Sequence, residues 1–145
     1  VEKTNQKQVQ NIVLLMEKIL GTLGSKRITI LGTAFKPNTD DVRDSIAIEL
    51  IKKLLKKKVK ITIYDPKAMK NTRRIFGEKI ICAKSITDAL NKSQCAVFMT
   101  HWKQFEGFNN NSMKRMSKKF IIDCRRILVK KELHAEYHAI GIGKT

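Results

Sequence analysis

The segment of the chain most suggestive of chemistry is ITILGTAFKPNTDDVRDSIAIEL, residues 28–50, where two apolar runs flank a polar loop. The loop carries two cations, Lys36 and Arg43. Asp44 and Ser45 stand where a helix would begin, and the free N–H groups of a helix start add partial positive charge beside Arg43. Cations held in this way suit a diphosphate ligand.

Two interpretations of this loop remain open from its residues alone. It could bind a diphosphate, with the acidic residues Asp40, Asp41 and Asp44 orienting the cations and capping the helix, or it could be a charged crossover loop with internal salt bridges. Gly32 lets the chain leave the first run tightly in either case. The sequence lacks G-x-G-x-x-G, so it carries no dinucleotide fingerprint.

Asp65 ends a second apolar run, VKITIYDP, at the position where a dinucleotide fold places a ribose-binding carboxylate. The Asp-Pro pair can equally well just stop the strand, and this second interpretation is the expected one.

The cysteine and histidine residues do not predict a metal site. No close cysteine pair or Cys/His cluster has metal-ligand spacing among Cys82, Cys95, Cys124, His101, His134 and His138. His134 and His138 have helical ligand spacing but no carboxylate motif beside them. Cys95 reads as a buried strand residue and His101 as an exposed loop residue. Few, scattered cysteines predict a reducing, cytoplasmic setting.

The net charge of +17, from 30 Lys and Arg against 13 Asp and Glu, favours anionic partners, and nucleic acid is the first to consider. However, the densest basic run, IKKLLKKKVK at 51–60, keeps apolar residues at helical spacing and reads as a solvated helix face. Aromatic residues are 6% of the chain and are not interleaved with the basic ones. We therefore predict no nucleic-acid partner and keep a basic nucleic-acid-binding α/β module as the alternative.

The order of elements predicts an α/β fold. Apolar positions at i, i+3 and i+4 spacing predict a long amphipathic helix over 9–23, ending near Gly21 or Gly24. Strands are then expected at 27–32, 59–66, 77–83, 94–100 and 119–125, with a further one in the tail from Tyr137. Helices are expected at 45–57, at 85–93 and near 110–118. This alternation predicts a Rossmann-like parallel sheet flanked by helices.

Ligands of such sheets bind at the carboxyl ends of the strands. If strands 28–31, 95–100 and 119–123 are neighbours, seven side chains converge at one edge: Phe35, Lys36, Arg43, Thr100, Trp102, Asp123 and Arg125. No apolar run approaches the ~20 residues of a membrane span, and no signal peptide is visible, so no membrane partner is expected. The first residue is Val, which suggests a piece of a longer protein.

These motifs resemble the carboxyl-terminal domain of the UDP-glucose/GDP-mannose dehydrogenase family. GTAFKPNTDDVRDS is similar to the family pattern G-x-[AS]-[FY]-K-x-x-T-D-D-x-R-[ED]-S. VEKTNQKQ, IYDPKA, THWKQF and IIDCRRIL match further family motifs in the same order, and together they cover essentially the whole chain. Within the family, FKPNTDD and the Trp of THWKQF are most similar to members that oxidise UDP-glucose.

The resemblance implies an enzyme that oxidises the C6 alcohol of a nucleotide sugar to a carboxylate, using two NAD that are bound mainly by an amino-terminal domain. By motif position, Phe35 and Lys36 would contact the UDP-sugar, and Arg125 would reach the substrate of the opposite subunit. Arg43 would approach the NAD pyrophosphate. Residues 1–23 would end the central dimerisation helix and residues 24–145 would form the UDP-sugar-binding domain, which predicts a homodimer.

The chain also departs from the family pattern. The G-F-G-G-S-C-F-P-K-D stretch with the family's nucleophilic Cys is absent, so no catalytic residue is assigned and this chain alone is expected to be inactive. Cys124 stands where the family usually has Gly, which leaves the backbone beside Arg125 in question. His101 replaces an acidic residue. A stand-alone UDP-binding regulatory domain remains a third possibility.

Overall fold

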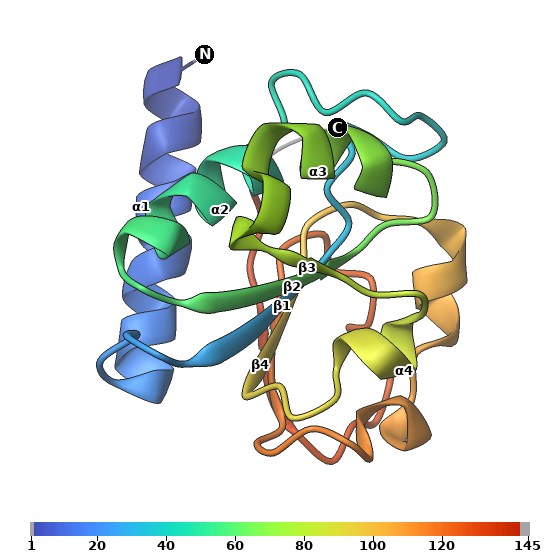
Figure 1. Cartoon of the computed structure of the whole chain (residues 1–145). Helices are drawn as coiled ribbons and strands as arrows, with labels where there is room; N and C mark the ends of the chain where they lie inside the picture. The colour runs from blue at the N-terminus through green and yellow to red at the C-terminus, as the bar shows by residue number, and fades with distance from the viewer. Residues whose placement is uncertain (1, 143–145) are drawn as a thin grey trace.

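The computed structural model describes residues 2–142, with side chains from Asn5 onward (Figure 1). It contains a parallel sheet with the strand order β3-β2-β1-β4-β5-β6. The strands are β1 (Arg27–Leu31), β2 (Lys60–Tyr64), β3 (Ile81–Cys82), β4 (Cys95–Phe98), β5 (Phe120–Asp123) and β6 (Glu136–Ala139). The helices are α1 (Glu2–Leu20), α2 (Ile46–Lys56), α3 (Met69–Phe76) and α4 (Ile86–Ala89). The predicted Rossmann-like fold is confirmed, since this is the order of doubly wound dinucleotide-binding sheets.

The sheet has a hydrophobic core on each face, which explains the continuous apolar strands in the sequence. All four residues of β4 are buried because this central strand is covered from both sides. One core joins the inward sides of α1 and α2 to the sheet, and the other packs α4 and the segment 102–116 on the opposite face. Figure 1 shows α1 and α2 on one side of the sheet and α4 on the other.

The basic run 51–60 forms most of α2 and the turn after it, as predicted. Ile51 and Leu54 are fully buried, whereas Lys52, Lys53 and Lys56 are exposed. The lysines therefore solvate a helix whose apolar stripe faces the core.

The apolar stripe of α1 is largely covered within the chain itself. Val9, Ile12, Val13 and Met16 are buried in the same core as α2, while Leu14 stays 55% exposed. Gly21 ends the helix with φ +77°, a left-handed conformation that glycine adopts without strain. Most of the apolar stripe of α1 is therefore buried against α2 and the sheet within the chain.

Several predicted elements are shorter than their sequence patterns indicated. The strand expected at 77–83 is reduced to Ile81–Cys82, because Gly77–Lys79 forms a single 3₁₀ turn. The helix expected near 110–118 is a 3₁₀ turn, Asn110–Met113, held by a reciprocal pair of hydrogen bonds between Asn109 and Ser112. A strand does form in the tail, as β6; the end of that prediction, 143–145, lies outside the described residues.

Candidate functional site

The candidate site lies at the carboxyl ends of the parallel strands. Four connecting segments meet there, and together we call them the carboxyl edge: 32–45 after β1, 65–68 after β2, 99–102 after β4 and 124–128 after β5. The chain crosses from β1 to β2 on one side and reaches β4 on the other, so β1 and β4 flank the topological switch point at which such sheets bind ligands.

Gly32 and Thr100 bring the first and third of these segments into contact at the switch point. Gly32 has φ +92°, and a Cβ built on it would lie 2.6 Å from the Cβ of Thr100. The Thr100 hydroxyl donates a hydrogen bond of 2.8 Å to the carbonyl oxygen of Ala34. Only a residue without a side chain fits at position 32, so the loop leaves β1 directly against the end of β4.

Asp65 is the principal anchor of the carboxyl edge. Its carboxylate is fully buried and accepts five hydrogen bonds. Oδ2 accepts from the backbone N–H groups of Thr33 (2.8 Å) and Ala34 (3.0 Å) and from the indole of Trp102 (3.1 Å). Oδ1 accepts from the backbone N–H groups of Lys67 (2.9 Å) and Ala68 (2.8 Å).

The prediction that Asp65 simply ends a strand therefore understates its role, and contact of its carboxylate with a ribose is not supported. Both oxygens already have protein donors, and the side chain has no exposed surface. The signal for its structural role was in the sequence: an Asp at a strand-to-helix junction accepts hydrogen bonds from the N–H groups two and three residues on.

The segment 33–45 is folded by its own hydrogen bonds. The Phe35 N–H donates to the carbonyl oxygen of Asp41 at 2.7 Å. The Asp41 carboxylate forms a bidentate pair with Arg43, with Nε at 3.0 Å and Nη2 at 2.9 Å. Hydrogen bonds from the Arg43 side chain and backbone lower the pKa of Asp41 to about 2. Both interpretations of the loop, the diphosphate site and the crossover loop with internal salt bridges, are compatible with this Asp41–Arg43 pair.

The predicted capping of α2 is wrong in its detail. Ser45 precedes the helix, but its hydroxyl donates to the carbonyl oxygen of Thr33 at 2.8 Å and makes no capping hydrogen bond. Asp44 has φ +58°, a left-handed conformation that Asp tolerates better than most residues. Ser45 therefore ties the end of the loop back to its beginning.

A second buried carboxylate, Asp123, organises the segment after β5. Its Oδ2 accepts from the Tyr137 hydroxyl (2.6 Å) and the Leu128 N–H (2.8 Å), and its Oδ1 accepts from the Arg125 N–H (3.3 Å). Burial, followed by the hydrogen bond to Asp123, raises the pKa of Tyr137. The Arg125 side chain donates from Nε to the carbonyl oxygen of Met99 at 2.9 Å, and partial burial lowers its pKa.

The predicted convergence of seven residues resolves into two groups. Thr100, Trp102 and Asp123 are buried and act as scaffold. Phe35, Lys36 and Arg43 are exposed on the first loop, and Arg125 is half-buried beside Met99. Because Ala34 contacts Thr100 while Arg125 contacts Met99, the Phe35 and Arg125 segments flank the same end of β4. The segments that carry these four side chains therefore share one edge of the sheet.

The histidine residues and Cys124, which the sequence analysis considered for chemistry, lie as follows in the structure. His134 lies in a loop and His138 in β6, so their spacing is not helical as the pattern suggested. Among residues 2–142, no group of three or more His, Cys, Asp and Glu side chains could hold a metal ion. His101 is partly exposed, and its Nε2 lies 2.9 Å from Oε2 of Glu106.

Cys124 is buried, and its backbone does not have a left-handed conformation; Arg126, two residues on, does, with φ +55°. The Gly-to-Cys departure therefore needs no left-handed backbone here.

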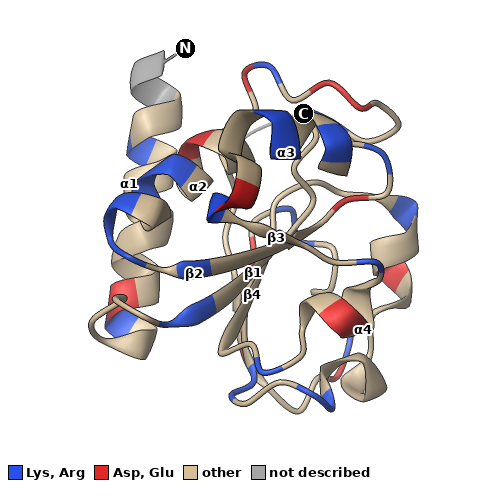
Figure 2. Cartoon of the chain, viewed as in Figure 1, with Lys and Arg blue, Asp and Glu red and all other residues tan. Residues whose placement is uncertain are grey.

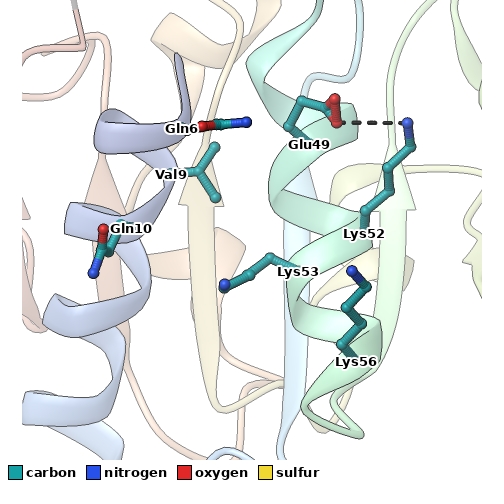
Figure 3. Close-up of a pocket in the computed structure, with 7 residues that line it drawn as sticks. All are labelled: Gln6, Val9, Gln10, Glu49, Lys52, Lys53 and Lys56. Carbon is teal, nitrogen blue, oxygen red and sulfur yellow. Dashed lines mark ion pairs between the residues drawn. The ribbon is translucent and has the colours of Figure 1, made fainter. Parts of the chain in front are cut away.

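A groove between α1 and α2, with a cavity volume of about 390 Å³, does not coincide with the carboxyl edge (Figure 3). Gln6 and Val9 point from α1 toward α2, and Lys53 points back. Lys52 pairs with Glu49 at 3.5 Å. Ligand pockets are lined mainly by apolar and aromatic side chains, whereas this groove has long polar ones apart from Val9.

The basic residues do not gather on one element of the fold. Figure 2 shows Lys and Arg on α1, α2, α3 and β2 and in loops at both ends of the sheet. Such a distribution does not favour the nucleic-acid alternative, which requires one continuous basic face. No helix of the described residues is both long enough and apolar enough to cross a membrane.

Comparison with known proteins gives consistent matches. Residues 29–130 match the UDP-binding domain of the UDP-glucose/GDP-mannose dehydrogenase family. The chain is 31% identical to UDP-glucose 6-dehydrogenase TuaD of Bacillus subtilis, covering 97% of this chain and 32% of that protein. It is 40% identical to UDP-glucose 6-dehydrogenase AglM of Haloferax volcanii over 76% of this chain and 25% of that protein.

The fold of the chain is also similar to that of a solved structure. A UDP-glucose dehydrogenase from Pyrobaculum islandicum superimposes with a TM-score of 0.77 at 28% identity, over 99% of this chain and 30% of that one. The chain therefore spans between a quarter and a third of the length of these relatives.

Proposed function

The chain belongs to the UDP-glucose/GDP-mannose dehydrogenase family and carries its UDP-binding domain, and we propose that this domain supplies one half of the substrate site of a UDP-glucose 6-dehydrogenase. The observation that carries the proposal is that Phe35 and Lys36 are exposed on the loop after β1, next to the switch point of the sheet. A half-site of this kind needs another domain or subunit to enclose the ligand.

The side chains suit the parts of a nucleotide sugar. Phe35 is 44% exposed and offers an aromatic face, and Lys36 beside it offers a cation to a diphosphate. Arg125 presents a planar guanidinium, held at Nε by the carbonyl oxygen of Met99. By its position in the family motif it would reach the substrate of the opposite subunit in a dimer, so it would not share a ligand with Phe35 and Lys36 of its own chain. These three residues bind and orient the UDP-sugar, and none of them carries out the chemistry.

The whole protein would oxidise the C6 alcohol of UDP-glucose to a carboxylate. The balanced reaction is RCH₂OH + H₂O + 2 NAD⁺ → RCOO⁻ + 2 NADH + 3 H⁺, and NAD supplies the hydride acceptor. The nucleophile and the main NAD site belong to parts of the protein outside this chain. The chain by itself is therefore expected to bind nucleotide and to have no turnover.

The switch point of this sheet does not fit NAD as a Rossmann domain would hold it. Thr100 fills the space beside Gly32, and the loop after β1 lacks the glycine fingerprint. Arg43 is the residue that this chain would direct to the NAD pyrophosphate across a domain boundary. Its side chain is 87% exposed and its guanidinium is paired with Asp41, which suits that position.

We further propose that residues 1–23 end a central dimerisation helix and that residues 24–145 form the UDP-sugar-binding domain. A homodimer is expected because residues 1–23 resemble the end of the family's central dimerisation helix. A cytoplasmic setting is expected because Cys82, Cys95 and Cys124 are all free thiols.

Calorimetric titration of the chain with UDP, UDP-glucose and UMP tests the proposal. We expect UDP and UDP-glucose to bind with a Kd on the order of 1 mM, about −4 kcal/mol, and UMP to bind more weakly. A parallel titration with duplex and single-stranded DNA serves as the comparison. Tight DNA binding with a steep salt dependence, together with no UDP binding, would contradict the proposed function.

A further inference from the structure

We propose that Asp65 is a positioning residue of the nucleotide-sugar site: it aims Phe35 and Lys36 by holding the segment before them and Trp102 on one buried carboxylate. The inference rests on the proposed function of Phe35 and Lys36. Asp65 itself is fully buried and would not touch the ligand.

The hydrogen-bond pattern carries the first step. Oδ2 of Asp65 accepts from the N–H groups of Thr33 and Ala34, which immediately precede Phe35 and Lys36. Two consecutive N–H groups that converge on one oxygen fix the orientation of the peptide planes between them. The direction in which Phe35 leaves the loop is therefore set by Asp65.

The second step concerns Trp102, whose indole donates to the same oxygen at 3.1 Å. Trp102 is buried and comes directly after the segment 99–101. In that segment Thr100 bonds to Ala34, and the carbonyl oxygen of Met99 accepts from Arg125. One carboxylate thus links the segment that carries Phe35 to the segment that holds Arg125. This link fixes the position of the Phe35 segment relative to the Arg125 segment at the carboxyl edge.

The third step is that the other oxygen is occupied as well. Oδ1 accepts from Lys67 and Ala68 at the start of α3, so the carboxylate cannot turn without losing donors on the other side. None of the five donors is a cationic side chain, and the buried charge is stabilised by N–H dipoles alone. An amide at this position has one acceptor oxygen and would face N–H donors with its own NH₂ group.

Asp65→Asn tests this role with little change in shape. We expect the affinity for UDP, measured by calorimetry on the full chain, to fall at least tenfold. Trp102 is the single tryptophan of the chain, so its fluorescence reports the same link directly. We expect Asp65→Asn to shift the emission to longer wavelength and to make Trp102 more accessible to acrylamide, under conditions in which circular dichroism shows a folded chain.

The matched control is Thr29→Val, which removes a buried hydroxyl on β1. The Thr29 hydroxyl lies 2.7 Å from the carbonyl oxygen of Ala89 in α4 and 2.9 Å from the hydroxyl oxygen of Ser93, and neither partner belongs to the carboxyl edge. This variant should lose stability yet keep its UDP affinity within twofold of the wild type. Equal loss of affinity in both variants would mean that Asp65 acts only through general stability, and would overturn the proposal.

A second variant covers the case in which Asp65→Asn does not fold. Trp102→Phe removes one of the five donors and leaves the carboxylate with four, and it should weaken UDP binding about threefold. A folded Asp65→Asn or Trp102→Phe chain with unchanged affinity would overturn the positioning role while leaving the proposed function intact. Failure of the wild-type chain to bind UDP would overturn both.

Discussion

Gly32 and Thr100 pack so closely that a single added methyl group on Gly32 would lie 2.6 Å from the Thr100 Cβ. The contact joins the ends of β1 and β4, the two strands that flank the switch point. It fixes the start of the loop that carries Phe35 and Lys36 against the end of β4.

Gly32→Ala should therefore destabilise the fold strongly. Gly21→Ala is the matched control, because Gly21 also has a positive φ, +77°, but no atom lies within 4 Å of the Cβ position. The left-handed backbone costs about 1–2 kcal/mol in both variants. Overpacking against Thr100 should add about 1–3 kcal/mol in Gly32→Ala alone. Urea unfolding measures the difference, and equal values for the two variants would rule out the steric role.

Phe35→Ala and Lys36→Ala should weaken UDP binding without loss of stability, because both side chains are exposed. We expect a loss of about tenfold for each variant, equivalent to about 1.4 kcal/mol. Lys53→Ala changes the net charge equally but lies on α2, and it should leave the Kd unchanged. If Lys53→Ala weakens binding as much as Lys36→Ala does, the effect comes from net charge and not from a site.

The Asp41–Arg43 pair predicts a defined pH dependence. The pKa of Asp41 is lowered to about 2, so the carboxylate helps to stabilise the loop above its unfolded pKa of about 3.9. That contribution is lost as the pH falls from about 4 toward 2. Carboxyl ¹³C NMR titration should show Asp41 titrating near 2.

Arg43→Gln is the control for this titration. Without the guanidinium, the pKa of Asp41 should return toward its ordinary value of 3.8. A wild-type Asp41 that already titrates near 3.8 would show that the pair does not persist in solution.

The three thiols should differ in reactivity. Burial raises the pKa of Cys95 to about 12 and also raises that of Cys124, whereas Cys82 is only partly buried. Since the thiolate is the reactive form, one thiol should react readily with a disulfide reagent in the folded chain and three after unfolding. Cys82→Ser should abolish the fast reaction. A fast reaction that survives in Cys82→Ser would contradict the burial of Cys95 or Cys124.

Much of the architecture could be predicted because the apolar periodicity is local and strong. The stripe of α1, the uniformly apolar β4 and the amphipathic α2 all follow from patterns of a few residues. The bounds of β4 and α2 differ by one or two residues from those expected, whereas α1 spans Glu2–Leu20 instead of 9–23. The predictions failed where a pattern was short or where a contact from elsewhere competed with it. The segment 77–83 is mostly a turn, and Ser45 bonds the carbonyl oxygen of Thr33 instead of capping α2.

The sequence by itself determined the alternation of elements, the polar loop after β1 and the residue types Phe35, Lys36, Arg43 and Arg125 that a nucleotide site would use. The local hydrogen bonds from Lys67 and Ala68 to Asp65 could be read from the sequence. Only the tertiary structure decided that Asp65 is an anchor, because its other three donors lie 31 to 37 residues away in the chain. Only the tertiary structure also decided that Thr100, Trp102 and Asp123 are scaffold. Burial and hydrogen-bond partners depend on strands that are distant in sequence and adjacent in the sheet, and no local pattern records them.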